Sequence, residues 1–438
     1  MGYETADFYS DPSLVEDPHS YFDFLRSQGP VTRLPHRNVV AVTGYEETVQ
    51  VMLDTEHFSS INAVGGPIPP LPFEPEGDDI TAQLEANRHR IPMADQVVTE
   101  QGDRHSQLRS IIARLFTPSR LKALEPSLKA TADALIDEFA NDGKVELVSQ
   151  YGGPYATLVI ADLLGVPESG RQKFRTYLAD SVPAQLGKEP DLEDMKHSGF
   201  AKVGKEMFGY LGRRRLMSKA PLSLFKGLFG YKDDEILTEL AQATFPDGSK
   251  PGLVDLTALA AFLFGAGQDT TNRLLSNGFR VIATRPDIQE ELRANPKRIP
   301  DFIEELLRFE GSVKSGGRMC QKTITLGGVE IKAGTTILLS HMAANRDPKR
   351  FENPHEFDMN RPKIKEHLAF GRGAHTCIGA PLARREVAVS IERLLARMGN
   401  VRLSEAHHGP EGSRHFDYME TYILRALNTL HLEFDPIG

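Results

Sequence analysis

The sequence predicts a mainly α-helical fold that carries small β-sheets. Apolar residues recur at three-to-four spacing over long stretches, which is typical of amphipathic helices, whereas strand-like runs are few and short. The 438 residues contain no internal repeat and no low-complexity linker, so nothing indicates separate domains. We therefore predict one domain over residues 1–438, with β-containing parts near residues 30–60, 320–340 and 415–435 and helical parts at residues 100–310 and 380–400.

The individual elements follow from local patterns. Five segments have the helical spacing: residues 119–140, 199–216, 255–284, 299–308 and 381–398. Four short runs resemble strands: residues 39–43, 323–326, 335–340 and 422–434. Prolines remove backbone donors and disfavour helix, so the proline-rich stretch at residues 61–76 predicts a long surface loop. Two further loops are predicted at residues 218–230 and 406–414.

Bulk properties exclude several classes of protein. A formal net charge of −9 and a pI near 5.9 disfavour nucleic acid as a partner. The longest apolar run, near residues 256–267, is shorter than the ~20 residues that cross a bilayer. The first residues lack the pattern of a secretory signal, so we expect a cytoplasmic protein with no membrane span. The only two cysteines, Cys320 and Cys377, exclude a disulfide framework and any four-cysteine metal site.

One of the two cysteines lies in a distinctive loop. Residues 370–379 read FGRGAHTCIG and are followed by a predicted helix. The glycines, Gly371 and Gly379 among them, let a flat ligand approach the main chain closely, and Phe370 is expected to pack beside the sulfur. Cys377 precedes the helix, where unpaired amides and the helix dipole favour a thiolate. An inert buried cysteine is the simpler alternative, but the length of the pattern favours an axial metal ligand.

This loop resembles the haem-binding signature of the cytochrome P450 family, and every fixed position of that signature is present. Further similarity runs from about residue 105 to residue 434. The resemblance implies a single large P450-type fold in which a long central helix crosses the haem. It also implies haem b as the cofactor, with its iron held by Cys377.

The resemblance gives roles to two further sets of residues. Glu305 and Arg308 stand one helical turn apart, and alone they would be read as a surface ion pair. In the family such a pair joins a later arginine, here Arg361, in a network that holds the cysteine loop on the core. Four basic residues correspond to the family's partners for the haem propionates, and these are His105, Arg109, Arg318 and His375.

The longest predicted helix, about 45 Å long at ~1.5 Å per residue, contains the sequence GAGQDTT in its middle. Gly265 and Gly267 each cost about 1 kcal/mol there relative to alanine, and we expect close approach to a ligand plane to offset that cost. Thr270 is expected to bond back to the carbonyl of Ala266. A merely kinked core helix is the alternative. The resemblance assigns oxygen activation to Thr270, with Asp269 relaying protons, and places Ala266 beside the haem.

The chain contains no flavin or iron–sulfur motif, so its electrons must come from outside. We expect a ferredoxin or flavodoxin with an NAD(P)H-dependent reductase, and a monomeric protein. Against the overall charge of −9, residues 361–385 carry a single acid, Glu366. The basic residues there offer a docking surface for an acidic donor, although a solvated face is the alternative. They are Arg361, Lys363, Lys365, Arg372, Arg384 and Arg385.

The substrate pocket is the least defined part. By position relative to the matched motifs, it should be lined by Phe262, Ala266, Thr270, Val313, Lys314, Tyr422 and Ile423. The apolar lining implies a lipophilic substrate such as a terpenoid, steroid, fatty acyl or aromatic compound. Lys314 is the exception, and it either extends to the surface or to a propionate or anchors a substrate carboxylate.

Together these expectations describe a haem-thiolate monooxygenase that inserts one oxygen atom from O2 into a lipophilic small molecule. The alternative is a non-oxygenating haem-binding protein or sensor, which has no need of the pair formed by Asp269 and Thr270. Peroxide-driven hydroxylation would be expected to replace that pair.

Overall fold

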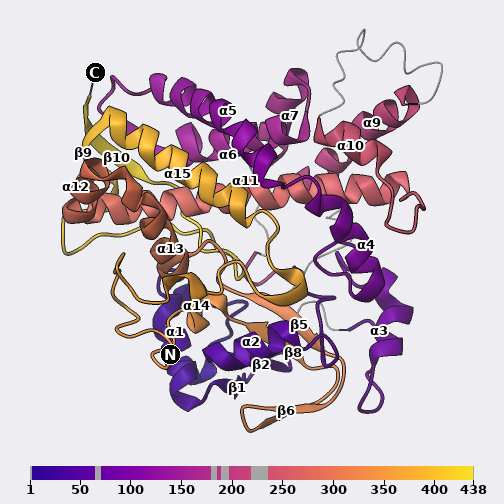
Figure 1. The fold of residues 1–438 in the computed structure, drawn as a ribbon. Helices are drawn as coiled ribbons and strands as arrows, with labels where there is room; N and C mark the ends of the chain where they lie inside the picture. The colour runs from indigo at the N-terminus through magenta and orange to yellow at the C-terminus, as the bar shows by residue number, and fades with distance from the viewer. Residues whose placement is uncertain (1, 65–70, 179–184, 189–196, 219–234, 438) are drawn as a thin grey trace.

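The computed structural model describes residues 2–64, 71–178, 185–188, 197–218 and 235–437, and helices dominate them (Figure 1). In the first half of the chain these are α1 (Pro18–Gln28), α2 (Tyr45–Leu53), α3 (Thr81–Asn87), α4 (Gly102–Ala113), α5 (Pro118–Asp137), α6 (Gly153–Leu164), α7 (Glu168–Leu178) and α9 (Gly199–Met217). The later helices are α10 (Ile236–Gln242), α11 (Leu253–Thr284), α12 (Pro286–Ala294), α13 (Ile299–Glu310), α14 (His341–Ala344), α15 (Ala380–Arg397) and α16 (Glu405–His408).

Three small sheets accompany the helices. The largest has the order β1 (Val31–Arg33), β2 (Val39–Val42), β8 (Thr336–Leu339), β5 (Gly316–Cys320), β3 (Phe58–Ser59). Only β2 and β8 pair in parallel, in the register Val39 to Thr336. A second sheet has the order β4 (Lys144–Glu146), β10 (His431–Pro436), β9 (Met398–Leu403). The third is the hairpin of β6 (Ile324–Leu326) and β7 (Val329–Ile331).

The predicted mainly α-helical fold is confirmed, and each of the five predicted helices is present to within three residues at either end. Two predictions were wrong in part. Only the end of the predicted strand at residues 422–434 is a strand, because the preceding residues fold back in isolated bridges such as Val313 to Leu424. The predicted loop at residues 406–414 begins inside α16. Parts of the other two predicted loops, residues 65–70 and 219–234, lie outside the described residues.

Helix α11 connects the two largest parts of the hydrophobic core. Its C-terminal half contributes Leu274 and Phe279 to a cluster with α5, α13 and α15, and its N-terminal half contributes Leu256 and Phe264 to a cluster with α4, α6 and α9. Figure 1 shows α11 crossing the molecule, with α5, α6 and α15 on one side and the five-stranded sheet on the other. Between its two buried halves, residues 265–270 are not buried. The centre of the helix therefore belongs to neither cluster.

The glycines of α11 have a different role from the expected one. A Cβ atom on Gly265 would lie 2.9 Å from the ring of Phe200 on α9, and one on Gly267 would lie 3.2 Å from Ile160 on α6. Both positions therefore face neighbouring helices. The expectation that these glycines offset their cost by admitting a ligand plane was wrong, because they allow close packing of three helices instead.

Candidate active site

The Cys377 loop is held by its own backbone. Gly371 and Gly373 have φ angles of 65° and 74°, a region that glycine adopts without strain. The amide of Cys377 donates to the carbonyl of Phe370 over 2.8 Å, which closes the loop before α15 begins. The guanidinium of Arg384 lies 4.7 Å from the centre of the Phe370 ring. Gly379 is the N-cap of α15. Together these contacts hold the backbone that carries the Cys377 sulfur.

The Cys377 thiol is less acidic than its place before a helix suggests. Burial raises the pKa of the Cys377 thiol, while the amides of Gly379 and Ala380 and the charges on Arg109 and Arg384 act in the opposite direction. The amides at the helix end therefore favour the thiolate as expected, but they do not outweigh burial. A bound metal ion is what deprotonates a coordinating thiol.

Behind this loop lies a buried ionic network. The carboxylate of Glu305 accepts from Arg308 over 2.6 Å and from Arg361 over 3.1 Å, and the side chains of Glu305 and Arg308 are 0% exposed. The remaining Arg308 N–H groups donate to the carbonyls of Asn345, Pro354 and Glu356. The arginines therefore tie α13 to residues 345–361, the segment that leads into the Cys377 loop.

The four predicted propionate partners gather in one place. The rings of His105 and His375 lie 4.2 Å apart, and Arg109 on α4 donates to the carbonyl of Thr376. Burial, followed by the charges of Arg318, His105 and Arg109, lowers the pKa of His375 to about 3. Burial also lowers the pKa of Arg318 to about 10. Among the described residues no carboxylate pairs with Arg109 or Arg318, so the cluster is a concentration of uncompensated positive charge.

The unburied centre of α11 carries the predicted catalytic pair. The Thr270 hydroxyl donates to the carbonyl of Ala266 over 2.7 Å, as expected, and Ala266 is exposed although it lies in mid-helix. Asp269 accepts from Arg273 over 3.0 Å. Arg273 in turn donates to the carbonyl of Leu427 over 2.8 Å, so the carboxylate is held by an anchored partner. The sequence analysis did not include Arg273.

Three segments meet beside this centre. The hydroxyl of Ser312 donates to the carbonyl of Thr270 over 2.7 Å, and the amide of Lys314 donates to the carbonyl of Ile423 over 2.7 Å. Half-buried Val313 bridges to Leu424. The structure therefore brings the segments of the predicted pocket residues together, whereas half-buried Phe262, one turn before Ala266, packs against the α4–α6–α9 cluster.

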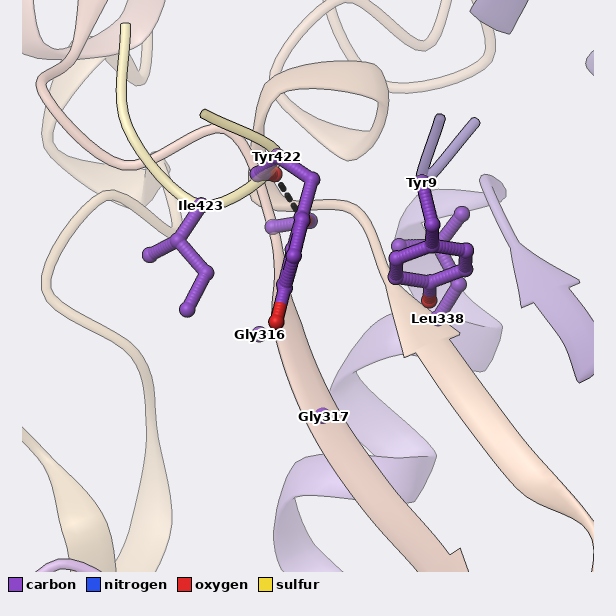
Figure 2. Close-up of a pocket in the computed structure, with 7 residues that line it drawn as sticks. Tyr9, Gly316, Gly317, Leu338, Tyr422 and Ile423 are labelled. Atoms are coloured by element: carbon purple, nitrogen blue, oxygen red, sulfur yellow. Dashed lines mark hydrogen bonds between the residues drawn. The ribbon is translucent and has the colours of Figure 1, made fainter. Parts of the chain in front are cut away.

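A small pocket opens next to Tyr422 and Ile423 (Figure 2). The Tyr422 hydroxyl points toward Gly316 on β5, and the Tyr9 ring lies 5.1 Å from the Tyr422 ring, edge to face. The pocket encloses about 180 Å³, including open solvent, which is below the ~300–1,000 Å³ typical of ligand sites. It is therefore a side pocket, and the contribution of Tyr9 from the N-terminal segment was not anticipated.

Lys314 does not extend to the surface. It is 3% exposed, and its ammonium donates to the carbonyl of Thr421. Burial, with a smaller effect from Arg425, lowers the pKa of Lys314 to about 7. The expected extension to solvent was wrong, because the return of residues 421–425 covers this side chain.

Sequence reasoning also missed a buried acid behind α11. Glu386 on α15 accepts from the hydroxyl of Thr271 over 2.9 Å. Burial raises the pKa of Glu386 to about 7, and the hydrogen bond from Thr271 opposes it only in part. One sequence pattern could have revealed it. Glu386 stands in line with the apolar residues of the predicted helix at residues 381–398, on the side that faces the core.

Comparisons with known proteins identify the class. A cytochrome P450 family model matches residues 232–399. The cytochrome P450 monooxygenase PikC of Streptomyces venezuelae is 32% identical over 396 residues, which cover 89% of this chain and 86% of that protein. The chain therefore belongs to the cytochrome P450 family. It is an oxidoreductase of the monooxygenase type that binds haem b and its iron.

Solved structures agree with this assignment. The substrate-free Mycobacterium marinum cytochrome P450 CYP150A6 is 48% identical, has a TM-score of 0.89 and covers 100% of both chains. Cytochrome P450 CYP109Q5 from Chondromyces apiculatus is 25% identical, with a TM-score of 0.79 and the same coverage. No helix among the described residues is long and apolar enough to span a membrane.

The residues present fit haem b. Haem carries two anionic propionates, and the cluster of His105, Arg109, Arg318 and His375 supplies cations and donors without a competing acid. The Nδ1 atom of His375 is enclosed and has no hydrogen-bond partner in the described structure, as expected for a ring whose partners include a group outside the chain. The single thiol of Cys377 suits haem iron.

Proposed function

We propose that the chain inserts one oxygen atom from O2 into a lipophilic small molecule above the centre of α11. The observation that carries this proposal is the stretch of residues 265–270, which stays out of the core of an otherwise largely buried helix and bears Asp269 and Thr270. When bound, haem supplies the iron at which O2 is reduced. A sensor has no use for an acid and a hydroxyl at this place.

In this proposal each part of the site has one task. Cys377 holds the iron, and the basic cluster of His105, Arg109, Arg318 and His375 binds the propionates. The network of Glu305, Arg308 and Arg361 keeps the loop in place. Four further residues would contact the haem: Ala266, Phe370, Gly371 and Gly379.

Two side chains of α11 handle protons. The Thr270 hydroxyl donates its hydrogen bond to the carbonyl of Ala266. Its oxygen lone pairs are therefore free to accept a hydrogen bond from a protonated group above the helix. Asp269 keeps its carboxylate next to Thr270 through the bond to Arg273. Turning away from Arg273 would let Asp269 take up a proton from solvent and pass it on to the group that is hydrogen-bonded to the Thr270 oxygen.

We predict that Thr270→Ala still binds substrate but loses product, because electrons are diverted to hydrogen peroxide. Product formed per NAD(P)H should fall on the order of tenfold or more. Asp269→Asn should slow turnover with less uncoupling. Thr257→Ala is the control, since the Thr257 hydroxyl makes the same back-bond on α11, to Leu253 over 2.8 Å. Unchanged coupling in Thr270→Ala would remove Thr270 from the reaction.

The substrate is proposed only to the level of chemical class. The candidate lining of Phe262, Ala266, Val313, Tyr422 and Ile423 is apolar apart from one hydroxyl, which favours a terpenoid, steroid, fatty acyl or aromatic compound. One similar structure, P450BioI, contains a hexadec-9Z-enoic acid ligated acyl carrier protein and is 25% identical. An optical titration with these four classes, which follows the spin state of the haem, would select among them.

Several broader expectations also stay proposals. A single domain over residues 1–438 is supported by α11, which contributes to both large core clusters. A monomeric state and a cytoplasmic location rest on the sequence alone.

We propose a ferredoxin or flavodoxin, served by an NAD(P)H-dependent reductase, as the electron donor. Only part of the basic segment is available to dock it. Arg361 is buried against Glu305, and Arg372 donates to Tyr45 and to the carbonyl of Glu366. Lys363 and Lys365 are exposed and have no ion pair in the described structure. Arg385 is 47% exposed beside Glu125.

Charge reversal at these exposed positions should therefore impair electron delivery alone. We predict that Lys363→Glu combined with Lys365→Glu slows ferredoxin-supported reduction several-fold at low salt and flattens its dependence on ionic strength. The substrate dissociation constant should not change. Lys332→Glu, directly after β7, is a control that reverses a single lysine outside the segment, half of the charge change in the double variant. If the reversed protein is reduced at the wild-type rate in low salt, the segment is only a solvated face.

A further inference from the structure

The basic cluster at the candidate haem site has a neighbour that neither the sequence motifs nor the assigned roles include. His341 begins α14, one residue after the end of β8. We propose that His341 is a fifth haem-binding residue, which donates a hydrogen bond to a propionate beside Arg318. This inference rests on the proposed role of Arg318.

Strand pairing brings the two side chains together. In the antiparallel pair of β5 and β8, Gly316 lies opposite Leu339 and Arg318 opposite Ile337. Side chains two residues apart along a strand point to the same face, so Arg318 lies on the same face of β5 as Gly316. A Cβ atom on Gly316 would lie 3.4 Å from Cε1 of His341. The absence of a side chain at Gly316 therefore gives the imidazole its room.

The hydrogen bonds of the His341 ring are incomplete. Its Nδ1 atom is enclosed without a partner, and the half-buried ring forms no other hydrogen bond in the described structure. Only the opposite nitrogen, Nε2, is left to reach a group outside the chain. With no acceptor beside Nδ1, the ring proton is better placed on Nε2, and that N–H then has no acceptor among the described residues.

The charges around the ring select the kind of partner. Arg318 is the charged group that acts on His341, and burial together with Arg318 lowers the pKa of His341 to about 4. The other cation of β5 and its approach, Lys314, is bonded to the carbonyl of Thr421. His341 is therefore a neutral donor beside a buried cation, and no carboxylate faces either of them in the described part of the chain. A carboxylate group of a ligand suits both.

Two substitutions of similar length separate this role from a purely structural one. His341→Gln keeps a neutral N–H donor near the position of Nε2, whereas His341→Glu replaces it with an anion. In the haem-free protein, glutamate should be tolerated, because it can pair with Arg318. In the haem-loaded protein, the same anion would repel a propionate.

The measurement is haem release from the ferric holoprotein to excess apomyoglobin, together with thermal unfolding of the haem-free protein. We expect His341→Gln to release haem at a rate close to wild type. His341→Glu should release haem roughly fivefold faster or more. The haem-free form of His341→Glu should melt no lower than the haem-free form of His341→Gln. His89→Glu, at an exposed histidine with no ion pair in the described structure, should change neither property.

Equal release rates for the glutamine and glutamate variants would overturn the inference. The inference would also be overturned if His341→Glu lowered the melting temperature of the haem-free protein as well as speeding haem release. That combination is the result expected of a histidine with a purely structural role. Failure of the proposed function would look different, because the wild-type protein would then not take up haem through Cys377 at all.

Discussion

Cys377→Ala should abolish the red-shifted Soret band of the reduced carbon monoxide complex, which is the spectroscopic signature of thiolate ligation. The physical reason is the loss of the only thiolate available to the iron. The fold should persist, because the bond that closes the loop joins the amide of residue 377 to the carbonyl of Phe370 and needs no side chain. The far-ultraviolet circular dichroism spectrum, recorded beside the visible spectrum, checks both statements.

Cys320→Ala is the control for this experiment. Cys320 on β5 is 0% exposed, and its sulfur donates to the carbonyls of Lys322 and Ile331. Burial raises the pKa of the Cys320 thiol to about 12, so it remains a protonated, inert core residue. Its loss should leave the spectrum unchanged. A thiolate-type spectrum that survives in Cys377→Ala would show that the assigned ligand is wrong.

Glu305→Gln should be the most destabilising of the substitutions considered. It removes the only carboxylate between two buried arginines, Arg308 and Arg361. Breaking a buried ion pair from one side costs about 3–5 kcal/mol, a large part of a typical total stability of about 5–15 kcal/mol. Denaturant unfolding of the haem-free protein should show this loss, and the holoprotein should retain little haem.

Glu291→Gln makes the same chemical change at the surface. Glu291 pairs with Arg298 over 2.8 Å, but its side chain is 43% exposed, and exposed pairs contribute under about 1 kcal/mol. Its unfolding midpoint should stay close to wild type. Similar losses in the two variants would mean that the Glu305 network does not hold the Cys377 loop in the way its contacts suggest.

Much of the fold and of the candidate site could be predicted from the sequence, because several of the sequence patterns are local. The Cys377 loop, the Thr270 back-bond and the long helices depend on spacing along one segment, and all were found. Other features depend on where distant segments meet. That Gly265 and Gly267 face Phe200 and Ile160 follows from the packing of α6, α9 and α11, which no periodicity within α11 reveals.

Residues that act through tertiary contacts were missed for the same reason. Arg273 is anchored by Leu427, which is distant in sequence. His341 packs over Gly316, on the same face of β5 as Arg318. Lys314 was misjudged because residues 421–425 cover it, and most of the strand predicted at residues 422–434 is irregular instead. A resemblance transfers motif positions, but not these surroundings.

The division of α11 between two core clusters has an evolutionary consequence. Proteins tolerate new substitutions only while they stay above a stability threshold, and most changes in a core lower stability. Positions 266 and 268 lie in the stretch that neither cluster buries. If these positions face the substrate as proposed, mutations there would alter which molecule reacts. They would change the free energy of unfolding little, because both ends of the helix supply the buried contacts. Helix α11 stabilises the fold through its two ends, while substitutions accumulate more easily at its centre. A lineage can therefore diversify its chemistry without first acquiring compensating mutations.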